Sequence, residues 1–181
     1  MKQKFDVITS TCVPLPLENV DTDQIIPARF LKATTREERF FGDNLFRDWR
    51  YRADGTPNPD FVLNNPTYSG CILVAGKNFG SGSSREHAPI AIKASGVSCV
   101  IAETFARIFY RNALNIALPI LECPAAVRAI SAADEVSVDL ETGEIVNHTT
   151  GQTFRAEPFP PFMMELIAAG GLVAYLKGKK A

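Results

Sequence analysis

The sequence predicts an α/β fold with a parallel-sheet core and an antiparallel appendage. Between residues 70 and 123, three short apolar runs alternate with helical segments, and this β-α-β-α-β order is typical of a parallel sheet with right-handed crossovers. After residue 134 the pattern changes to a two-residue period interrupted by turn signals, which is typical of β-hairpins.

Length and composition fit one globular domain over residues 1–181. The chain is 46% hydrophobic and 22% charged, with a formal net charge of −1, and it is long enough to bury a sizeable core. The sequence lacks a clustered basic face for nucleic acid, a bilayer-length apolar run and a signal-peptide apolar core. We therefore expect a cytoplasmic enzyme or enzyme subunit.

The first third of the chain predicts a strand, a loop and a helix. Residues 4–16 alternate weakly and predict one or two short strands ended by Pro14 and Pro16. Residues 18–32 predict a loop, because the proline at position 27 disfavours a helix just before it. Residues 35–49 have helical charge spacing, which a glycine at position 42 weakens.

The central third predicts the parallel core. After a surface loop at 52–70, rich in Gly, Pro, Asn and Asp, the strands are expected at 70–76, 97–103 and 117–123. The first crossover helix, 87–96, is expected to end at a glycine cap, Gly96. In the second, 104–115, helical spacing places three apolar residues inward and two arginines outward: Phe105, Ile108, Phe109, Arg107 and Arg111.

The last third predicts a helix at 124–134, hairpins over 135–157 and one final helix at 161–178. The turn signals are Thr142-Gly143 and Thr150-Gly151.

The cysteines indicate no metal framework in this chain. Cys12, Cys71, Cys99 and Cys123 are far apart in sequence and form no C-x-x-C pair, so neither an iron–sulfur nor a zinc site is predicted. We expect small buried thiols in a reducing compartment.

The segment 77–89, "KNFGSGSSREHAP", joins a predicted strand to a predicted helix. It lacks the Gly-Lys-Ser/Thr of a P-loop and the third glycine of the dinucleotide fingerprint. Ser83 and Glu86 have the spacing of a helix capping box, but Pro89 would then lie inside the helix and cost a hydrogen bond, which favours a helix start nearer His87.

The position of this loop favours anion binding. Ligands of open α/β sheets bind at the carboxyl ends of the strands, and free N–H groups at the start of a helix attract anions. Arg85 adds a side chain able to hold a carboxylate or phosphate in a bidentate manner.

The loop, the downstream "FARI" and the upstream "VDTDQIIPARFLK" resemble the small subunits of 3-isopropylmalate dehydratase, which are similar to the mobile C-terminal domain of aconitases. The resemblance runs over most of residues 19–122. It implies a swivelling β/β/α domain and interconversion of 2- and 3-isopropylmalate through an alkene, in leucine biosynthesis. It also implies a [4Fe–4S] cluster held by a separate large subunit and not by this chain.

By the same resemblance, Ser83 matches the catalytic base, and Ser84 and Arg85 match ligands of a substrate carboxylate. Asp23 matches an acidic residue that aconitases place near the site; ordinary loop capping is its alternative role. A serine needs neighbouring donors and positive charge to act as a base, and Arg85 and the adjoining backbone N–H groups are suited to supply them.

Substrate choice is the part the motifs leave open. Ile26, Phe30 and Leu31 are the candidates for a specificity loop, with plain core packing as their alternative. Aconitases carry a further substrate arginine in this segment, which neither Arg29 nor Arg36 matches clearly. Related hydro-lyase small subunits, of the homoaconitase or methylmalate type, and a stand-alone anion- or nucleotide-binding module are the competing functions.

Overall fold

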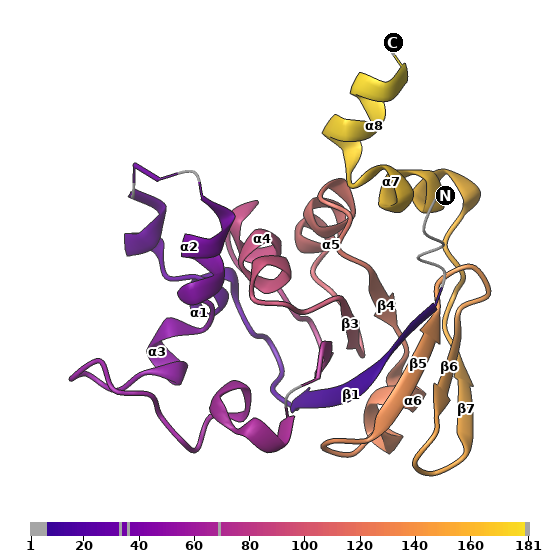
Figure 1. Cartoon of the computed structure of the whole chain (residues 1–181), viewed down its shortest axis with the longest axis horizontal. Helices are drawn as coiled ribbons and strands as arrows, with labels where there is room; N and C mark the ends of the chain where they lie inside the picture. The colour runs from indigo at the N-terminus through magenta and orange to yellow at the C-terminus, as the bar shows by residue number, and fades with distance from the viewer. Residues whose placement is uncertain (1–6, 33, 36, 69, 180–181) are drawn as a thin grey trace.

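The computed structural model describes residues 7–32, 34–35, 37–68 and 70–179. It confirms the α/β class: the strands form one seven-stranded sheet in the order β4-β3-β2-β1-β5-β6-β7, which curls so that the hairpin strands stand at an angle to the parallel half (Figure 1). β1 to β4 are parallel to one another, and β5, β6 and β7 are antiparallel.

The predicted strands are present at close to their expected positions. Their bounds are β1 (Val7–Leu15), β2 (Ile72–Ala75), β3 (Cys99–Ala102), β4 (Ile120–Glu122), β5 (Glu135–Asp139), β6 (Glu144–Asn147) and β7 (Gln152–Arg155).

The helices are shorter and more numerous than the sequence indicates. They are α1 (Thr22–Ile25), α2 (Glu38–Asp43), α3 (Arg47–Arg50), α4 (His87–Ala94), α5 (Arg107–Asn115), α6 (Pro124–Ala129), α7 (Pro161–Ala169) and α8 (Leu172–Lys179), with 3₁₀ turns η1 (Ala28–Lys32), η2 (Val62–Asn64) and η3 (Pro66–Tyr68). Among the described residues, none of these helices has the length and apolar character that crossing a membrane requires.

β1 joins the two halves of the sheet because it changes neighbours along its length. Its first half, 7–11, pairs antiparallel with β5, and its second half, 12–15, pairs parallel with β2. The prediction that Pro14 ends the strand is wrong. Beyond residue 11 β1 is paired to another strand on only one edge, so the missing N–H of a proline can face the other edge.

Two apolar cores lie on opposite faces of the parallel strands. Leu73 and Val100 point into a core shared with α1, α2, α4 and α5. Ile72 and Ile101 point into a second core, shared with α6, α7 and the inner face of the hairpins. Burial on both faces explains why these strands are uninterrupted apolar runs.

Three expectations about helices need correction. The segment 18–32 is not a plain loop, since it contains α1 and η1. The helix at 35–49 is broken at Phe46, which has a left-handed φ of 49°. The final helix is two helices, because Gly170 and Gly171 have φ values of 86° and 117° between α7 and α8.

Helix α5 also departs from its expected pattern. Phe105 and Phe109 are buried as predicted, and Arg107 and Arg111 are exposed, but Ile108 is 50% exposed. Its neighbour in sequence, Phe109, takes the inward position, so the buried side of this helix is narrower than its apolar content suggests.

Candidate active site

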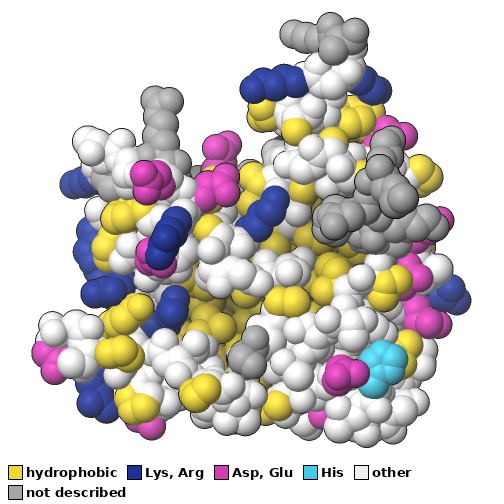
Figure 2. Space-filling view, in the orientation of Figure 1, with side chains coloured by type: hydrophobic (Ala, Val, Ile, Leu, Met, Phe, Trp, Pro, Cys, Tyr) yellow, Lys and Arg dark blue, Asp and Glu magenta, His cyan; other side chains and the backbone are white. Residues whose placement is uncertain are grey.

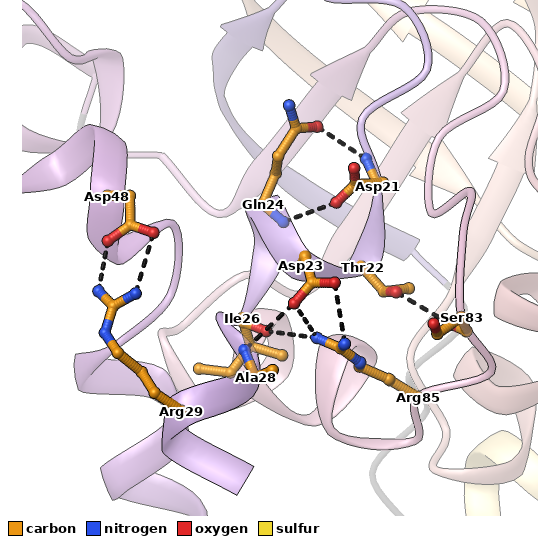
Figure 3. Close-up of polar contacts among 10 residues, drawn as sticks. All are labelled: Asp21, Thr22, Asp23, Gln24, Ile26, Ala28, Arg29, Asp48, Ser83 and Arg85. Carbon is orange, nitrogen blue, oxygen red and sulfur yellow. Dashed lines mark hydrogen bonds and ion pairs between the residues drawn. The ribbon is translucent and has the colours of Figure 1, made fainter.

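The Gly/Ser loop lies alongside the segment that contains α1 (Figure 3). The N–H of Gly80 donates to the Val20 carbonyl at 2.7 Å, and the N–H of Thr22 donates to the Ser81 carbonyl at 2.8 Å. The Thr22 hydroxyl donates to the Ser83 carbonyl at 3.0 Å. Two segments sixty residues apart are thereby joined at the carboxyl edge of the parallel strands.

Helix α1 ends before the residue that Pro27 restricts, since Ile26 is extended, and two backbone donors at its start are satisfied by side chains. The Gln24 N–H donates to Asp21 Oδ1 at 2.8 Å, and the Asp21 N–H donates to Gln24 Oε1 at 2.9 Å. This is a capping box built from Asp and Gln. The D-x-x-Q spacing before an apolar pair was the sequence signal for it, and the loop prediction overlooked it.

The turn at Gly80 brings the loop close to α5. Gly80 has a φ of 81°, and a Cβ at this position would lie 2.2 Å from Cγ of Phe109. Only glycine combines the left-handed backbone with this approach.

The capping-box reading of Ser83 and Glu86 is wrong, and the expectation of a helix start near His87 is confirmed. α4 begins at His87, Glu86 is its N-cap residue without a side-chain cap bond, and Pro89 falls in the first turn. Ser83 and Ser84 are exposed ahead of the helix. The Ser83 hydroxyl is therefore not used for capping.

Arg85 and Asp23 form a bidentate ion pair next to these serines (Figure 3). Arg85 Nη1 lies 2.5 Å from Asp23 Oδ1 and Nη2 lies 2.9 Å from Oδ2. Nη1 also donates to the Ile26 carbonyl at 3.3 Å, and the Ala28 N–H donates to Asp23 Oδ1 at 3.2 Å. The Arg85 side chain is 14% exposed and that of Asp23 is 54% exposed. The hydrogen bond from Arg85 lowers the pKa of the Asp23 carboxyl group.

A second pair of the same type lies a short distance along the chain. Arg29 binds both carboxylate oxygens of Asp48, and both side chains are more than half exposed. Arg29 is thus engaged away from the serine loop, while Arg36 lies outside the described residues.

The three specificity candidates differ in accessibility. Ile26 is fully buried and belongs to the core. Phe30 and Leu31 are half-buried at the edge of the same core. The Phe30 ring packs edge-on against the Phe40 ring, with the two ring centroids 6.1 Å apart. Ile26 thus has the position that core packing requires, and a role in specificity stays a prediction for all three residues.

The site is an open edge. Hollows of about 720 and 460 Å³ lie elsewhere, the first beside β1 and α7 and the second between Arg29, Arg47 and Arg52, and neither contains Ser83, Ser84 or Arg85. Figure 2 shows Lys and Arg side chains gathered on the side formed by α1 to α3. A second surface is needed to enclose a ligand over the serines.

The side chains of this chain do not fit an iron–sulfur cluster. Within the described ranges no three His, Cys, Asp or Glu residues are grouped to hold a metal ion. Cys12, Cys99 and Cys123 are buried. Burial raises the pKa of the Cys12 thiol to about 12 and raises that of Cys99 as well, whereas a cluster ligand must be a thiolate.

Comparison with known proteins defines the class. The Aconitase C-terminal domain family matches residues 2–126, which is more than half of the chain. The chain therefore belongs to the aconitase C-terminal domain family.

Its similar relatives are small subunits of dehydratases and isomerases. It is 55% identical over 162 residues to the 3-isopropylmalate dehydratase small subunit of Caldicellulosiruptor bescii, covering 90% of each chain. It is 55% identical to the 2,3-dimethylmalate dehydratase small subunit of Eubacterium barkeri, over 88% of this chain and 90% of that relative. It is 52% identical to the isopropylmalate/citramalate isomerase small subunit of Methanocaldococcus jannaschii, covering 90% of each.

A solved structure confirms the fold. The crystal structure of 3-isopropylmalate dehydratase from Methanocaldococcus jannaschii superposes with a TM-score of 0.78 at 37% identity and covers 96% of this chain and 95% of that one.

Proposed function

We propose that this chain is the small subunit of a 3-isopropylmalate dehydratase, which interconverts 2- and 3-isopropylmalate by removing and re-adding water in leucine biosynthesis. The observation that carries the proposal is the Asp23–Arg85 pair, which holds a guanidinium group beside Ser83 and Ser84 at the carboxyl edge of the sheet. The dehydratase and isomerase small subunits among its relatives support the same reaction class.

Arg85 is the ligand of a substrate carboxylate. A guanidinium group has five N–H donors in a planar fork. Nη1 donates to Asp23 and to the Ile26 carbonyl, and Nη2 donates to Asp23. The edge that contains Nε remains for a second carboxylate, and the Ser84 hydroxyl lies on the same loop. Asp23 thus orients Arg85 and does not replace the substrate.

Ser83 is the base that takes the proton from the carbon beside that carboxylate, and it returns a proton on rehydration. A serine hydroxyl is a weak base, so its alkoxide form needs stabilisation by a nearby positive charge and by backbone N–H groups. Arg85 supplies the charge two residues away, and α4, which begins at His87, adds the free N–H groups and positive dipole end of a helix start.

A large subunit completes the site. The serines lie on an open edge, the buried thiols of this chain do not suit a cluster, and the relatives are small subunits by name. We assign a [4Fe–4S] cluster to the partner, where it supplies the Lewis acid for the substrate hydroxyl group. Residues 1–181 act as one swivelling domain over that partner in the cytoplasm.

The alternative substrates are the acids named for two relatives, 2,3-dimethylmalate and citramalate, together with homoaconitase-type tricarboxylates. These acids share the carboxylate beside the reacting carbons and differ in the side group. Phe30 and Leu31, half-buried at the edge of the core and a few residues after Asp23 in sequence, are the residues we propose to discriminate between side groups.

Reconstitution with a large subunit tests the proposal. The complex should convert 2-isopropylmalate to 3-isopropylmalate, followed by alkene absorbance, and should turn over citrate and homocitrate far more slowly. A chain that forms no complex, and that binds a nucleotide or inorganic anion tightly when alone, would instead be a stand-alone binding module.

A further inference from the structure

Thr22 makes an unusual use of a hydroxyl group. It is 2% exposed, and with Asp134 and Asn147 it is one of three buried polar residues in the part of the chain that the structure describes. A buried hydroxyl group is costly unless it forms a hydrogen bond. Its partner here is the Ser83 carbonyl at 3.0 Å, on a segment sixty-one residues away (Figure 3).

Helix capping does not require this hydroxyl group. Thr22 is the first residue of α1, but Asp21 and Gln24 already form the complete capping box. The side chain of Thr22 is therefore directed outside its own helix, to the loop.

Thr22 holds the loop on both sides of Gly82. Its N–H donates to the Ser81 carbonyl at 2.8 Å, and its hydroxyl donates to the Ser83 carbonyl. Gly82 has a φ of 90°, and a Cβ there would lie 3.6 Å from the Thr22 hydroxyl oxygen. Two hydrogen bonds from Thr22 thus fix the backbone on both sides of a flexible glycine. The β-branched side chain of Thr22 has few rotamers of its own.

The bond bears directly on the proposed base. Ser83 is exposed, and its own hydroxyl group forms no hydrogen bond among the described residues. The direction of its side chain is set by its backbone, and a bond to its carbonyl fixes the peptide between Ser83 and Ser84. The next residue of α1, Asp23, holds the Arg85 side chain through an ion pair.

We propose that Thr22 is a positioning residue: its hydroxyl group sets the direction of the Ser83 side chain and of the Ser84 N–H. This inference rests on the proposed function, in which Ser83 is the base. It assigns α1 the role of a template that holds Ser83 through Thr22 and Arg85 through Asp23.

Thr22→Val and Thr22→Ser test it in the reconstituted complex. Valine keeps the shape and loses the donor, so kcat should fall by about 10- to 100-fold, the scale of a misplaced reacting group, while KM changes by less than about threefold. Serine keeps the donor and should restore kcat to within about threefold of the wild type.

Ser10→Ala is the matched control. The Ser10 hydroxyl accepts from the Cys71 N–H at 2.9 Å, away from the serine loop, so its loss should lower Tm without changing kcat. In the isolated chain, the valine variant should also shift the amide NMR signals of Ser83, Ser84 and Arg85, which needs no partner and no activity.

Two results would overturn the inference: a valine variant with wild-type kcat and unshifted signals, or a serine variant as slow as the valine one. If Thr22→Val does not fold, kcat and the amide NMR signals of Thr22→Ser decide the question. An inactive wild-type complex would instead count against the proposed function.

Discussion

Two Arg–Asp pairs with the same bidentate geometry lie near each other, and they differ in their surroundings. In the pair of Asp23 and Arg85, the arginine side chain is 14% exposed and the partner residues lie on two segments sixty-two residues apart. In the pair of Arg29 and Asp48, both side chains are more than half exposed. Exposed ion pairs contribute little because water and salt screen them. In the proposed site the first pair positions the Arg85 guanidinium group, whereas the second belongs to the solvated surface.

The largest effect is expected where the first pair meets the serines. Ser83→Ala removes the proposed base and leaves both ion pairs intact, so turnover should fall by about 10²- to 10⁴-fold, with complex assembly and cluster absorbance unchanged. Steady-state kinetics and the visible spectrum of the complex measure this. Ser98→Ala, an exposed serine at the opposite end of the sheet, should have no effect; near-normal turnover of Ser83→Ala would contradict the assignment.

Exchanging each arginine for lysine compares the pairs directly. Arg85→Lys keeps the charge and loses the planar fork, so KM should rise by about 10- to 100-fold, the cost of hydrogen bonds to a charged group. Arg29→Lys should leave KM within about twofold of the wild type, because Arg29 is held at the surface. Equal effects in the two variants would remove the distinction between the pairs.

Ile26 and Leu31 separate packing from substrate choice in the segment between the pairs. Ile26→Ala should lower the free energy of unfolding by about 2–5 kcal/mol, because it opens a cavity at a fully buried position. Leu31→Ala should instead change the ratio of kcat/KM between isopropylmalate and citramalate by about tenfold. Urea unfolding and paired substrate assays distinguish the two, and an unchanged ratio for Leu31→Ala would leave it as a packing residue.

The smallest effect is expected from pH. Arg85 lowers the pKa of the folded Asp23 carboxyl below its ordinary value, and Arg29 does the same for Asp48. A lowered folded pKa stabilises the protein above the unfolded value of about 4, and this contribution is lost as pH falls through the folded pKa. Asp23→Asn and Asp48→Asn should each lower the free energy of unfolding at pH 7 by less than about 1 kcal/mol. In both variants Tm should depend less on pH below pH 4.

At neutral pH the two asparagine variants should differ in function. Asp23→Asn should raise KM, because Arg85 loses its charged partner, whereas Asp48→Asn should not. A KM that rises equally in both variants would place Asp48 in the site as well.

The sequence predicted what depends on local patterns. The apolar runs of β2, β3 and β4 and the turn glycines Gly143 and Gly151 placed the core and the hairpins. The helix break at Phe46 had no local signal, because a phenylalanine rarely adopts a left-handed backbone. The break between α7 and α8 did have one, the Gly170-Gly171 pair, which the prediction of a single final helix overlooked. The central place of β1 was also missed, since no local pattern reveals that one strand pairs with two distant partners.

Likewise, the sequence brought Ser83, Ser84 and Arg85 together because they are neighbours in one motif. It placed Asp23 near them only through the resemblance, and the ion pair required the fold. Thr22 was missed altogether: a threonine beside a capping aspartate has no sequence signal that its hydroxyl is directed to another segment.

The change of partners along β1 has a consequence for the order of folding. Its second half pairs with residues 72–75, but its first half pairs with residues 135–139. During synthesis from the N-terminus, the residues of α1, the Gly/Ser loop and the β1–β2 pair are therefore made before the strand that covers the other edge of β1. Contacts of such long sequence separation slow folding and leave a strand edge open meanwhile. The residues of the proposed site are thus synthesised while the sheet still lacks the strand that covers this edge.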